Sequence, residues 1–395
     1  MSANISKKDL EKWAEYLVDY SLGGVRSDDV IMIKGEKIAW PLISTLQDKI
    51  FKDGGIADVN IIAPDNDRGK IWGASIAKHG TIEQINKVPQ WHIDRYNAMT
   101  KYIEILGAED PELFTGVRED LAQEVMKVDS PVKNIRLAKP WVLTLFPTKG
   151  FADLEGMTLE EYTEVIVKAS TVDPRYLEEV EEDIYQLMNK SSKVRIETER
   201  PKTGKQLTLE MAINDRFIVK CTGKRNFPDG EVFTSPNANS VEGEIFVDLP
   251  VFQGGTTIQG IYLRFEGGVI KEYSAEKGFE ALQKIIETDD GSHRLGEVAL
   301  GMNNGIDKVL MHPLFVEKLG GTLHIAIGAS YPECFVGQED ASPEMTNAYL
   351  INGVMNDSAQ HVDIVTDFKP GGSGRAVYLD DVKLEIKDNI WVVPK

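Results

Sequence analysis

The sequence predicts an α/β N-terminal domain with a mainly parallel sheet, followed by a β-rich α+β metal-binding domain. In the first half of the chain, short apolar runs alternate with segments of helical period, which is typical of a parallel sheet covered by helices. From Val194 onward, alternating apolar and polar residues are broken by clusters of Gly, Pro, Asn and Asp, which is typical of strands joined by turns. We place the boundary near residue 190, which gives domains at 1–190 and 191–395.

The composition is that of a folded, acidic protein. Of its 395 residues, 42% are hydrophobic and 27% are charged, an ordinary balance for globular domains, and the length favours two of them. The 63 Asp and Glu residues outnumber the 44 Lys and Arg residues, so the formal net charge is -19. Because this charge repels the phosphates of a polynucleotide, we expect no nucleic-acid partner.

Neither a disulfide scaffold nor a secretory or membrane segment is expected. The two cysteines, Cys221 and Cys334, are far apart and form no C-x-x-C motif, which argues against a zinc ribbon. The segment from Ser2 to Gly23 carries many charges of both signs, unlike a signal or transit peptide. Apolar runs such as Trp141–Phe146 are far shorter than the roughly 20 residues that cross a bilayer. We therefore expect no membrane association and a cytoplasmic location.

The first domain opens with a helix and a βαβ unit. Leu10, Trp13, Ala14 and Leu17 recur at helical spacing, and Gly23–Gly24 ends that helix. The elements expected after it are a strand at Val30–Ile33, a helix through Leu42, Leu46 and Ile50 that ends at Gly54–Gly55, and strands at Asp58–Ala63, Tyr102–Leu106 and Trp141–Phe146.

A dinucleotide site is not expected in this domain. Such a site needs a glycine-rich turn between the first strand and its helix. After Ile33 the chain reads Lys34-Gly35-Glu36-Lys37, with a single glycine. The first domain is therefore interpreted as a scaffold or a substrate-entry domain.

The passage to the second domain is marked by helix signals and then by strands. Thr158 and Glu161 form a capping box before a helix that runs to about Ala169, and Pro174 starts another through Leu187. Strands are expected afterwards at Val194–Glu197, Gln206–Met211, Phe217–Cys221 and Glu244–Asp248, with one helix at Glu276–Glu287.

Two histidine-containing strands are candidates for metal binding. Within the apolar run Thr322–Ile327, period-two geometry sends His324 to the same face as the small residues Ala326 and Gly328, which leave room beside the imidazole. His361 and Asp363 are two residues apart, so a strand presents both on one face. This pair suits a divalent ion as well as a simple hydrogen-bonded pair. His293 and His312, also in the second domain, receive no role.

Two carboxylates also stand in unusual surroundings. Glu297 lies in the apolar stretch Arg294–Gly301, where a lone carboxylate is costly to bury without a cation or metal. Glu231 follows a turn and opens a predicted strand. Either carboxylate also suits a structural ion pair, with Arg294 or Arg225 as the cation.

Taken together, these side chains predict a metal site rich in oxygen donors. Two imidazoles and three carboxylates form an oxygen-rich donor set with nitrogen ligands that suits Zn, Co or Mn, and it is not a thiolate site. Five donors exceed the needs of one closed site, whereas two ions about 3.5–4 Å apart that share a carboxylate use all of them. The set consists of Glu231, Glu297, His324, His361 and Asp363.

The motifs around these residues resemble the thermophilic-type metallo-aminopeptidases, the family of aminopeptidase T, aminopeptidase S and PepS. The resemblance is carried, in order, by Asn226–Pro236, Arg294–Glu297, Leu323–Glu333 and His361–Asp363, and it covers essentially the whole second half. It implies a homodimer whose sites face an internal cavity. It also implies a two-metal centre with Glu231, Glu297, His324, Tyr331, His361 and Asp363.

The chemistry implied by this resemblance is removal of the N-terminal residue from peptides. Two divalent metal ions per subunit activate a water, and the phenol of Tyr331 helps the metals to stabilise the tetrahedral oxyanion. Glu297 or Glu231 shuttles the proton to the leaving amine. Carboxylates favour a substrate with a free α-ammonium group, so peptides with a free N-terminus are the expected substrates.

Two other functions stay open. A two-metal phosphoesterase uses the same donors but needs a basic clamp for phosphate oxygens, for which Arg294 and Arg375 are the obvious candidates. The third hypothesis is a non-catalytic acidic binding module whose metal-ligand residues no longer serve catalysis.

Overall fold

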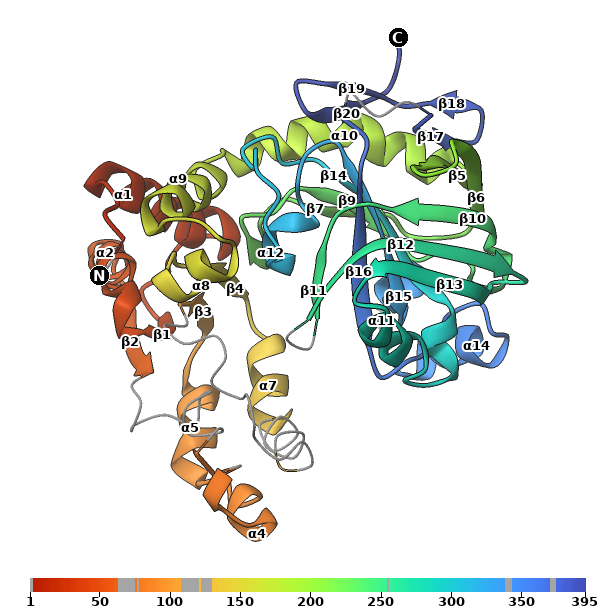
Figure 1. Cartoon of the computed structure of the whole chain (residues 1–395). Coiled ribbons are helices and arrows are strands. Elements are labelled where there is room, and N and C mark those ends of the chain that lie inside the picture. The colour runs from red at the N-terminus through yellow and green to blue at the C-terminus, as the bar shows by residue number, and fades with distance from the viewer. Residues whose placement is uncertain are drawn as a thin grey trace. The chain divides into compact units, whose positions relative to one another are not determined.

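The chain folds as two compact units (Figure 1). In this computed structural model, the structure describes residues 3–62, 75–76, 78–107, 121, 130–253, 256–337, 343–369 and 374–395. The first unit comprises Met1–Pro174 and Gly223–Pro228, and the second comprises Arg175–Thr222 and Asp229–Lys395. The boundary that we predict near residue 190 lies at the end of helix α10 (Pro174–Lys190), whereas the second compact unit begins at Arg175. Ile184 and Met188 of this helix join the hydrophobic core of the second unit.

The first unit is built on a parallel sheet, which confirms the predicted α/β class. Its strands pair in the order β2-β1-β3-β4-β8, and every pair is parallel. β8 comes from far along the chain and extends the sheet beside β4. The five strands are β1 (Val30–Glu36), β2 (Ile56–Ile62), β3 (Lys101–Leu106), β4 (Trp141–Leu145) and β8 (Asn226–Phe227).

Helices cover this sheet with the apolar faces that the sequence predicts. In α2 (Trp40–Lys52), Leu42, Leu46 and Ile50 are fully buried. The opening helix is not one regular α-helix, because α1 (Lys7–Glu15) continues as a π-helical segment at Tyr16–Ser21. The other described helices of the unit are α4 (Ile82–Ile85), α5 (Gln90–Ala98), α7 (Ser130–Leu137), α8 (Lys149–Leu154) and α9 (Leu159–Ser170).

The predicted capping box at the start of α9 is present. The Thr158 hydroxyl accepts a hydrogen bond from the backbone N–H of Glu161, and the Glu161 carboxylate accepts one from the backbone N–H of Thr158 at 2.9 Å. Two of the helix's free donors are thereby satisfied. The predicted strand at Asp58–Ala63 begins earlier, at Ile56, and Ala63 lies outside the described residues.

The described part of the second unit contains two large antiparallel sheets and the two-stranded antiparallel sheet β19-β20, in agreement with the predicted β-rich class. The larger one pairs in the order β11-β12-β10-β6-β5-β17-β18, and β13 lies beside β12. Its strands are β5 (Lys193–Arg200), β6 (Lys205–Ala212), β10 (Glu242–Val247), β11 (Val251–Gln253), β12 (Thr256–Glu266), β13 (Val269–Lys277), β17 (Ala376–Leu379) and β18 (Val382–Lys383).

The helix expected at Glu276–Glu287 is shorter than predicted. Strand β13 runs to Lys277, and α11 occupies Phe279–Ile286. Gly278 separates them with a φ of 75°, and a Cβ at this position would lie 2.6 Å from the carbonyl oxygen of Thr257. The change of direction at this glycine therefore ends the strand before the helix begins.

The smaller of the two large sheets, called here the site sheet, has strands in the order β16-β15-β14-β9-β7. One of its faces packs into the main core of the unit through Val298, Ile325 and Ile364, together with residues of the larger sheet. The five strands are β7 (Val219–Cys221), β9 (Glu231–Thr234), β14 (Leu295–Gly301), β15 (Thr322–Gly328) and β16 (His361–Asp367).

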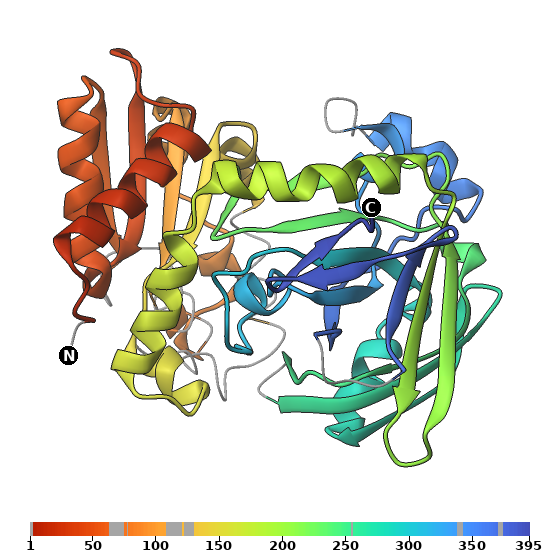
Figure 2. The same ribbon diagram turned by 90° about the horizontal axis from the view of Figure 1, so that it is seen from above.

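The long helix α10 and several short elements complete the second unit. Figure 2 shows α10, the long yellow-green helix, running along this unit, where its apolar face packs on the core. None of the described helices is both long enough and apolar enough to span a bilayer. The remaining elements are α12 (Pro313–Val316), α13 (Glu333–Val336), α14 (Pro343–Ile351), β19 (Glu385–Lys387) and β20 (Ile390–Val392).

Candidate metal centre

The five side chains expected to bind metal lie on one face of four adjacent strands of the site sheet. Ala326 of β15 pairs with Glu297 of β14 on one side and with Asp363 of β16 on the other. Because side chains alternate along a strand, these residues face away from the apolar core that their sequence neighbours fill. The small side chain of Ala326, which is fully buried, leaves space between the two carboxylates. His324 and His361 share this face on β15 and β16, and Glu231 shares it on β9.

A β-bulge brings Glu297 to this face. Leu295 lies in the apolar core, and a regular strand would place Glu297, two residues later, on the same side. The pairing register with β15 shifts between Leu295 and Glu297, so Gly296 is the extra residue. A Cβ on Gly296 would lie 1.9 Å from the carbonyl oxygen of Ala329, which explains the glycine. No local pattern in the sequence predicts this bulge.

His361 is oriented by the backbone. Its Nδ1 lies 2.7 Å from the carbonyl oxygen of Ala329, to which it donates a hydrogen bond. Its Nε2 therefore faces the carboxylates, 2.9 Å from Glu297 Oε2 and 3.3 Å from Asp363 Oδ1. Because Nδ1 is engaged with this carbonyl oxygen, Nε2 is the imidazole nitrogen that remains for a metal.

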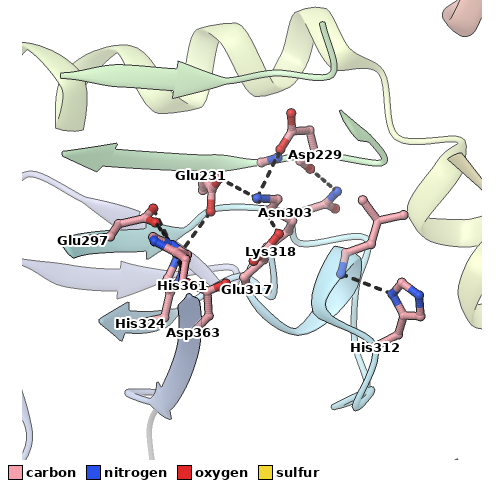
Figure 3. Close-up of polar contacts among 12 residues, drawn as sticks. Asp229, Glu231, Glu297, Asn303, His312, Glu317, Lys318, His324, His361 and Asp363 are labelled. Carbon is pink, nitrogen blue, oxygen red and sulfur yellow. Dashed lines mark hydrogen bonds and ion pairs between the residues drawn. The ribbon is translucent and has the colours of Figure 1, made fainter. Parts of the chain in front are cut away.

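His324 lies deeper in the same cluster. Its residue is 1% exposed, and its Nε2 is 3.5 Å from both Glu231 Oε2 and Glu297 Oε1. Glu297 thus contacts both imidazoles, one with each carboxylate oxygen, and Figure 3 shows the three side chains together. The side chains of His361 and Asp363 are 20% and 18% exposed, so the cluster is open to solvent at β16 and closed at β9.

Three overlapping groups of donor atoms that contain a histidine are close enough to hold ions, with all donors of a group within 4.8 Å of one another, and a fourth group, Cys221, Asp229 and Glu231, shares Glu231 with them. The inner group is Glu231, Glu297 and His324. The outer group is Glu297, His361 and Asp363. A third group adds Glu317 to His324 and Asp363.

The donors fit a divalent metal. Glu231 Oε2 is buried and makes no hydrogen bond within the described part of the chain. A buried carboxylate oxygen without a donor is costly unless a cation satisfies it. The mixed carboxylate and imidazole donors match the preferences of Zn, Co and Mn.

Without an ion, the two imidazoles themselves balance the carboxylates. Burial lowers the pKa of His324, but Glu297, Glu231 and Asp363 raise it to about 9. Burial also lowers the pKa of His361, yet Asp363 and Glu297 raise it to about 11. In turn, although burial raises the pKa of Glu297, hydrogen bonds from His324 and His361 bring it below its ordinary value.

Sequence reasoning missed Lys318 and Glu317. The cation beside Glu231 is Lys318, which contacts Glu231 Oε1 and lies 2.9 Å from Glu317 Oε1. Burial lowers the pKa of Lys318, but Glu231, Glu317 and Asp229 raise it well above its ordinary value. A Glu-Lys pair between the short helix α12 and a glycine-rich turn is the one sequence signal for this position. It resembles any solvated charged pair, so periodicity alone does not identify it.

The other charged and histidine candidates lie elsewhere. Arg294, considered as a partner of Glu297, donates to Asn239 Oδ1 at 2.9 Å instead. His312 caps α12, where its Nδ1 accepts from the backbone N–H of Leu314 at 3.3 Å, apart from the cluster in Figure 3. His293 lies in a 3-10 turn before β14 and belongs to none of the donor groups.

Tyr331 lies at the open side of the cluster. Its ring centroid is 4.7 Å from that of His361 and 5.3 Å from that of Phe233. Its backbone N–H donates to Ser235 Oγ at 2.9 Å, and the residue is 37% exposed. Burial and the nearby carboxylates, led by Glu297, raise the pKa of the phenol, so the hydroxyl keeps its proton.

The family profile of the thermophilic metalloproteases (M29) matches residues 6–370 of the chain. Aminopeptidase T of Thermus thermophilus is 41% identical over 142 residues, which are 35% of this chain and 33% of that protein. Aminopeptidase AmpS of Bacillus subtilis is 36% identical over 148 residues, 36% of this chain and 35% of that protein. In these alignments the chain spans about a third of the length of each relative.

Two solved structures share the fold along the whole chain. Wild-type AmpT from Thermus thermophilus has a TM-score of 0.75 at 23% identity, covering 98% of this chain and 100% of that one. A 2,5-dihydroxypyridine dioxygenase from Pseudomonas putida has a TM-score of 0.56 at 13% identity and covers 99% of both chains. A peptidase and a dioxygenase thus share one architecture, so the fold alone does not decide the reaction.

Proposed function

The chain belongs to the thermophilic metalloprotease family (M29), and we propose that it is a metal-dependent aminopeptidase. It would hydrolyse the N-terminal peptide bond of peptides that have a free N-terminus. The observation that carries the proposal is the convergence of Glu231, Glu297, His324, His361 and Asp363 into overlapping donor groups.

The inner and outer groups would hold two divalent ions, with Glu297 shared between them. When bound, such ions lower the pKa of a water to about 7 and polarise a carbonyl. Glu317, a member of the third group, offers a further oxygen beside His324 and Asp363.

The protein's own residues would then orient and stabilise the reacting groups. The protonated phenol of Tyr331, next to His361, suits a donor to the oxyanion that forms at the scissile carbonyl. Glu297 and Glu231 are the carboxylates placed to accept the proton of the water and return it to the leaving amine. The excess of carboxylates favours a substrate α-ammonium group, which limits cleavage to the first residue.

The test is reconstitution of a chelator-stripped sample. Aminoacyl chromogenic amides should be cleaved again after Zn, Co or Mn is added, and their N-acetylated forms should not be. Amide cleavage that persists at full rate without metal would contradict the proposal. Equal cleavage of the acetylated amides would point to an endopeptidase or an esterase instead.

The ligand set has its own test. Asp363→Ala should lower the metal content measured by elemental analysis, because it removes a donor from both the outer and the third group. Asp381→Ala, at an exposed aspartate in the turn after β17, is the matched control and should keep full metal content. Full occupancy in Asp363→Ala would show that the ligand set is wrong.

The structure offers little support for a phosphoesterase. Arg294 is engaged with Asn239, and Arg375 forms an ion pair with Asp248 Oδ2 at 2.6 Å. Neither guanidinium contacts a residue of the donor groups among the described residues. A phosphate ester included in the reconstitution assay tests this alternative, and a sample that binds metal without cleaving either substrate would favour a binding module.

We also propose that the protein is a cytoplasmic homodimer, as the family resemblance implies. Analytical ultracentrifugation of the full chain should give twice the mass of the chain, and cell fractionation should recover it with cytoplasmic enzymes. A monomer at micromolar concentration would contradict the predicted assembly.

A further inference from the structure

We propose that the buried ammonium of Lys318 weakens the inner ion subsite, so that the outer subsite fills first. The inference rests on the two-metal function proposed above. It gives one residue of this chain a positioning role, because Lys318 acts on the ions through Glu231 and through its own charge.

The ammonium of Lys318 lies inside the cluster rather than at its rim. It contacts Glu231 Oε1 and is 2.9 Å from Glu317 Oε1 and 3.7 Å from Asp229 Oδ1. Figure 3 shows it between these three carboxylates. The residue is 2% exposed, so water does not screen the charge as it would at the surface.

The backbone holds Lys318 in this position. Its carbonyl oxygen accepts a hydrogen bond from the backbone N–H of Asn303 at 2.9 Å. The side-chain amide of Asn303 in turn donates to the carbonyl oxygen of Asp229 at 2.6 Å. The lysine and one of its carboxylate partners are thus tied to the same asparagine, which limits how far the ammonium can move away.

The inner and outer groups therefore differ in their surroundings. Lys318 engages Oε1 of Glu231 and leaves Oε2, which lies 3.5 Å from His324 Nε2, as the oxygen available to an ion. Within the described part of the chain, the ion-pair partners of Lys318 are Glu231, Glu317 and Asp229. None of them belongs to the outer group. A positive charge next to the inner group repels a divalent ion there more strongly than at the outer group.

The experiment is a calorimetric titration of chelator-stripped full-length protein with Zn, in the wild type and in Lys318→Met. Methionine keeps an unbranched stem of similar length and removes the charge. The wild type should bind two ions with unequal affinities. In the variant, the second ion should bind at least tenfold more tightly, while the affinity for the first changes less than threefold.

A second variant shifts the balance the other way. Asp229→Asn removes a carboxylate next to the ammonium and leaves the inner, outer and third donor groups intact, while it removes one donor from the group of Cys221, Asp229 and Glu231. The charge of Lys318 is then less well compensated, so the second ion should bind at least threefold more weakly. If Lys318→Met does not fold, as judged by circular dichroism, Lys318→Gln, which also removes the charge, takes its place in the titration.

The outcomes separate the inference from the function on which it rests. If Lys318 had a merely structural role, both variants would bind both ions more weakly than the wild type does, and that result would overturn the inference. A second-ion affinity that is unchanged in Lys318→Met or in Asp229→Asn would also overturn it. A wild type that binds fewer than two ions would instead contradict the two-metal function itself, and the inference with it.

Discussion

The phenol of Tyr331 is the side chain whose role can be isolated most cleanly. If it donates a hydrogen bond to the oxyanion, Tyr331→Phe should lower kcat by about 10²–10³-fold, the usual effect of removing one such donor. KM should change little, because the interaction forms in the transition state. Metal content should stay at the wild-type level, because the variant keeps the five carboxylate and imidazole donors. Steady-state kinetics and elemental analysis on the same sample measure both quantities.

The control for this variant is another tyrosine of the same unit. Tyr378 lies on β17, where its ring contacts Arg195, and Tyr378→Phe should keep wild-type kcat. A loss of metal in Tyr331→Phe would instead show that the phenol serves as a ligand.

At the scale of single residues, predictions from the sequence succeed where all the residues concerned lie on one strand. The His361 and Asp363 pair follows from period-two geometry alone, and their side chains do meet at 3.3 Å. Lys318 escaped prediction because its contact with Glu231 joins positions 87 residues apart, in segments with no common period. Arg294 and Arg225 were the expected cations instead, because they lie near the two glutamates along the chain. Closeness in space between distant segments cannot be read from the sequence.

At the scale of elements, the bulge in β14 is a point where the fold and the site depend on one residue. Gly296→Ala would place a Cβ 1.9 Å from the carbonyl oxygen of Ala329, which also accepts the hydrogen bond of His361. Overpacking of this kind typically costs about 1–3 kcal/mol. We expect a lower free energy of unfolding in urea and weaker metal binding, because both Glu297 and His361 are displaced.

Gly107→Ala provides a comparison in which an added methyl has room. Its Cβ would lie 3.5 Å from Ile38 Cγ2, an ordinary van der Waals distance. Wild-type metal affinity in Gly296→Ala would show that the bulge does not position the ligands.

The carboxylate of Asp289 holds the segment that leads into β16 by accepting hydrogen bonds from it. It accepts hydrogen bonds from the backbone N–H of Ser292 at 2.8 Å, from the Ser358 hydroxyl at 2.9 Å and from the backbone N–H of Ala359 at 2.7 Å. Burial raises the pKa of Asp289, but these bonds bring it down to about 2. Asp289→Ala should therefore lower the free energy of unfolding by about 1–2 kcal/mol at neutral pH.

The pH dependence of this effect has a definite sign. Because the folded pKa is below the ordinary value of 3.8, the contribution is complete above that value and is lost as the pH falls toward about 2. The difference between wild type and Asp289→Ala should accordingly shrink between about pH 4 and pH 2 in urea titrations. Asp290→Ala, at the exposed neighbouring residue, should show neither the loss nor the pH dependence.

Elements that are specified by residues close together in the sequence were predicted well. Features that depend on which strands pair were not. The capping box at Thr158 and the strand–helix–strand start of the first unit follow from spacing within a few residues. The bulge at Gly296 and the addition of β8 to a sheet more than 80 residues upstream depend on partners that the local sequence does not specify.

At the scale of the whole molecule, all candidate ligands lie in the second unit, although the chain passes back into the first at Gly223–Pro228. The sequence placed these ligands in its second domain because strand patterns and histidines change there together. It did not predict the excursion at Gly223–Pro228, because two residues of strand carry too little periodicity to be recognised. Metal binding should therefore stabilise the unit formed by Arg175–Thr222 and Asp229–Lys395 directly.

This stabilisation should depend on pH through the two imidazoles. Without metal, the raised pKa values of His324 and His361 mean that their contacts with carboxylates stabilise the fold fully below about pH 6.5. That contribution is lost as the pH rises through about 9 for His324 and about 11 for His361. Metal binding needs neutral imidazoles, so at low pH each ion must displace protons that already stabilise the protein.

The melting temperature should therefore rise more on addition of metal at pH 8.5 than at pH 6.5, at equal free metal concentration. At a thousandfold excess over Kd, the gain approaches about 4 kcal/mol. Differential scanning calorimetry with buffered Zn measures it, and Asp363→Ala should show a smaller gain at both pH values because it lacks one donor. A gain that is equal at the two pH values in the wild type would mean that the imidazoles release no protons to the solvent when metal binds. His324 and His361 would then not be ligands, and the ions would be held by carboxylates alone.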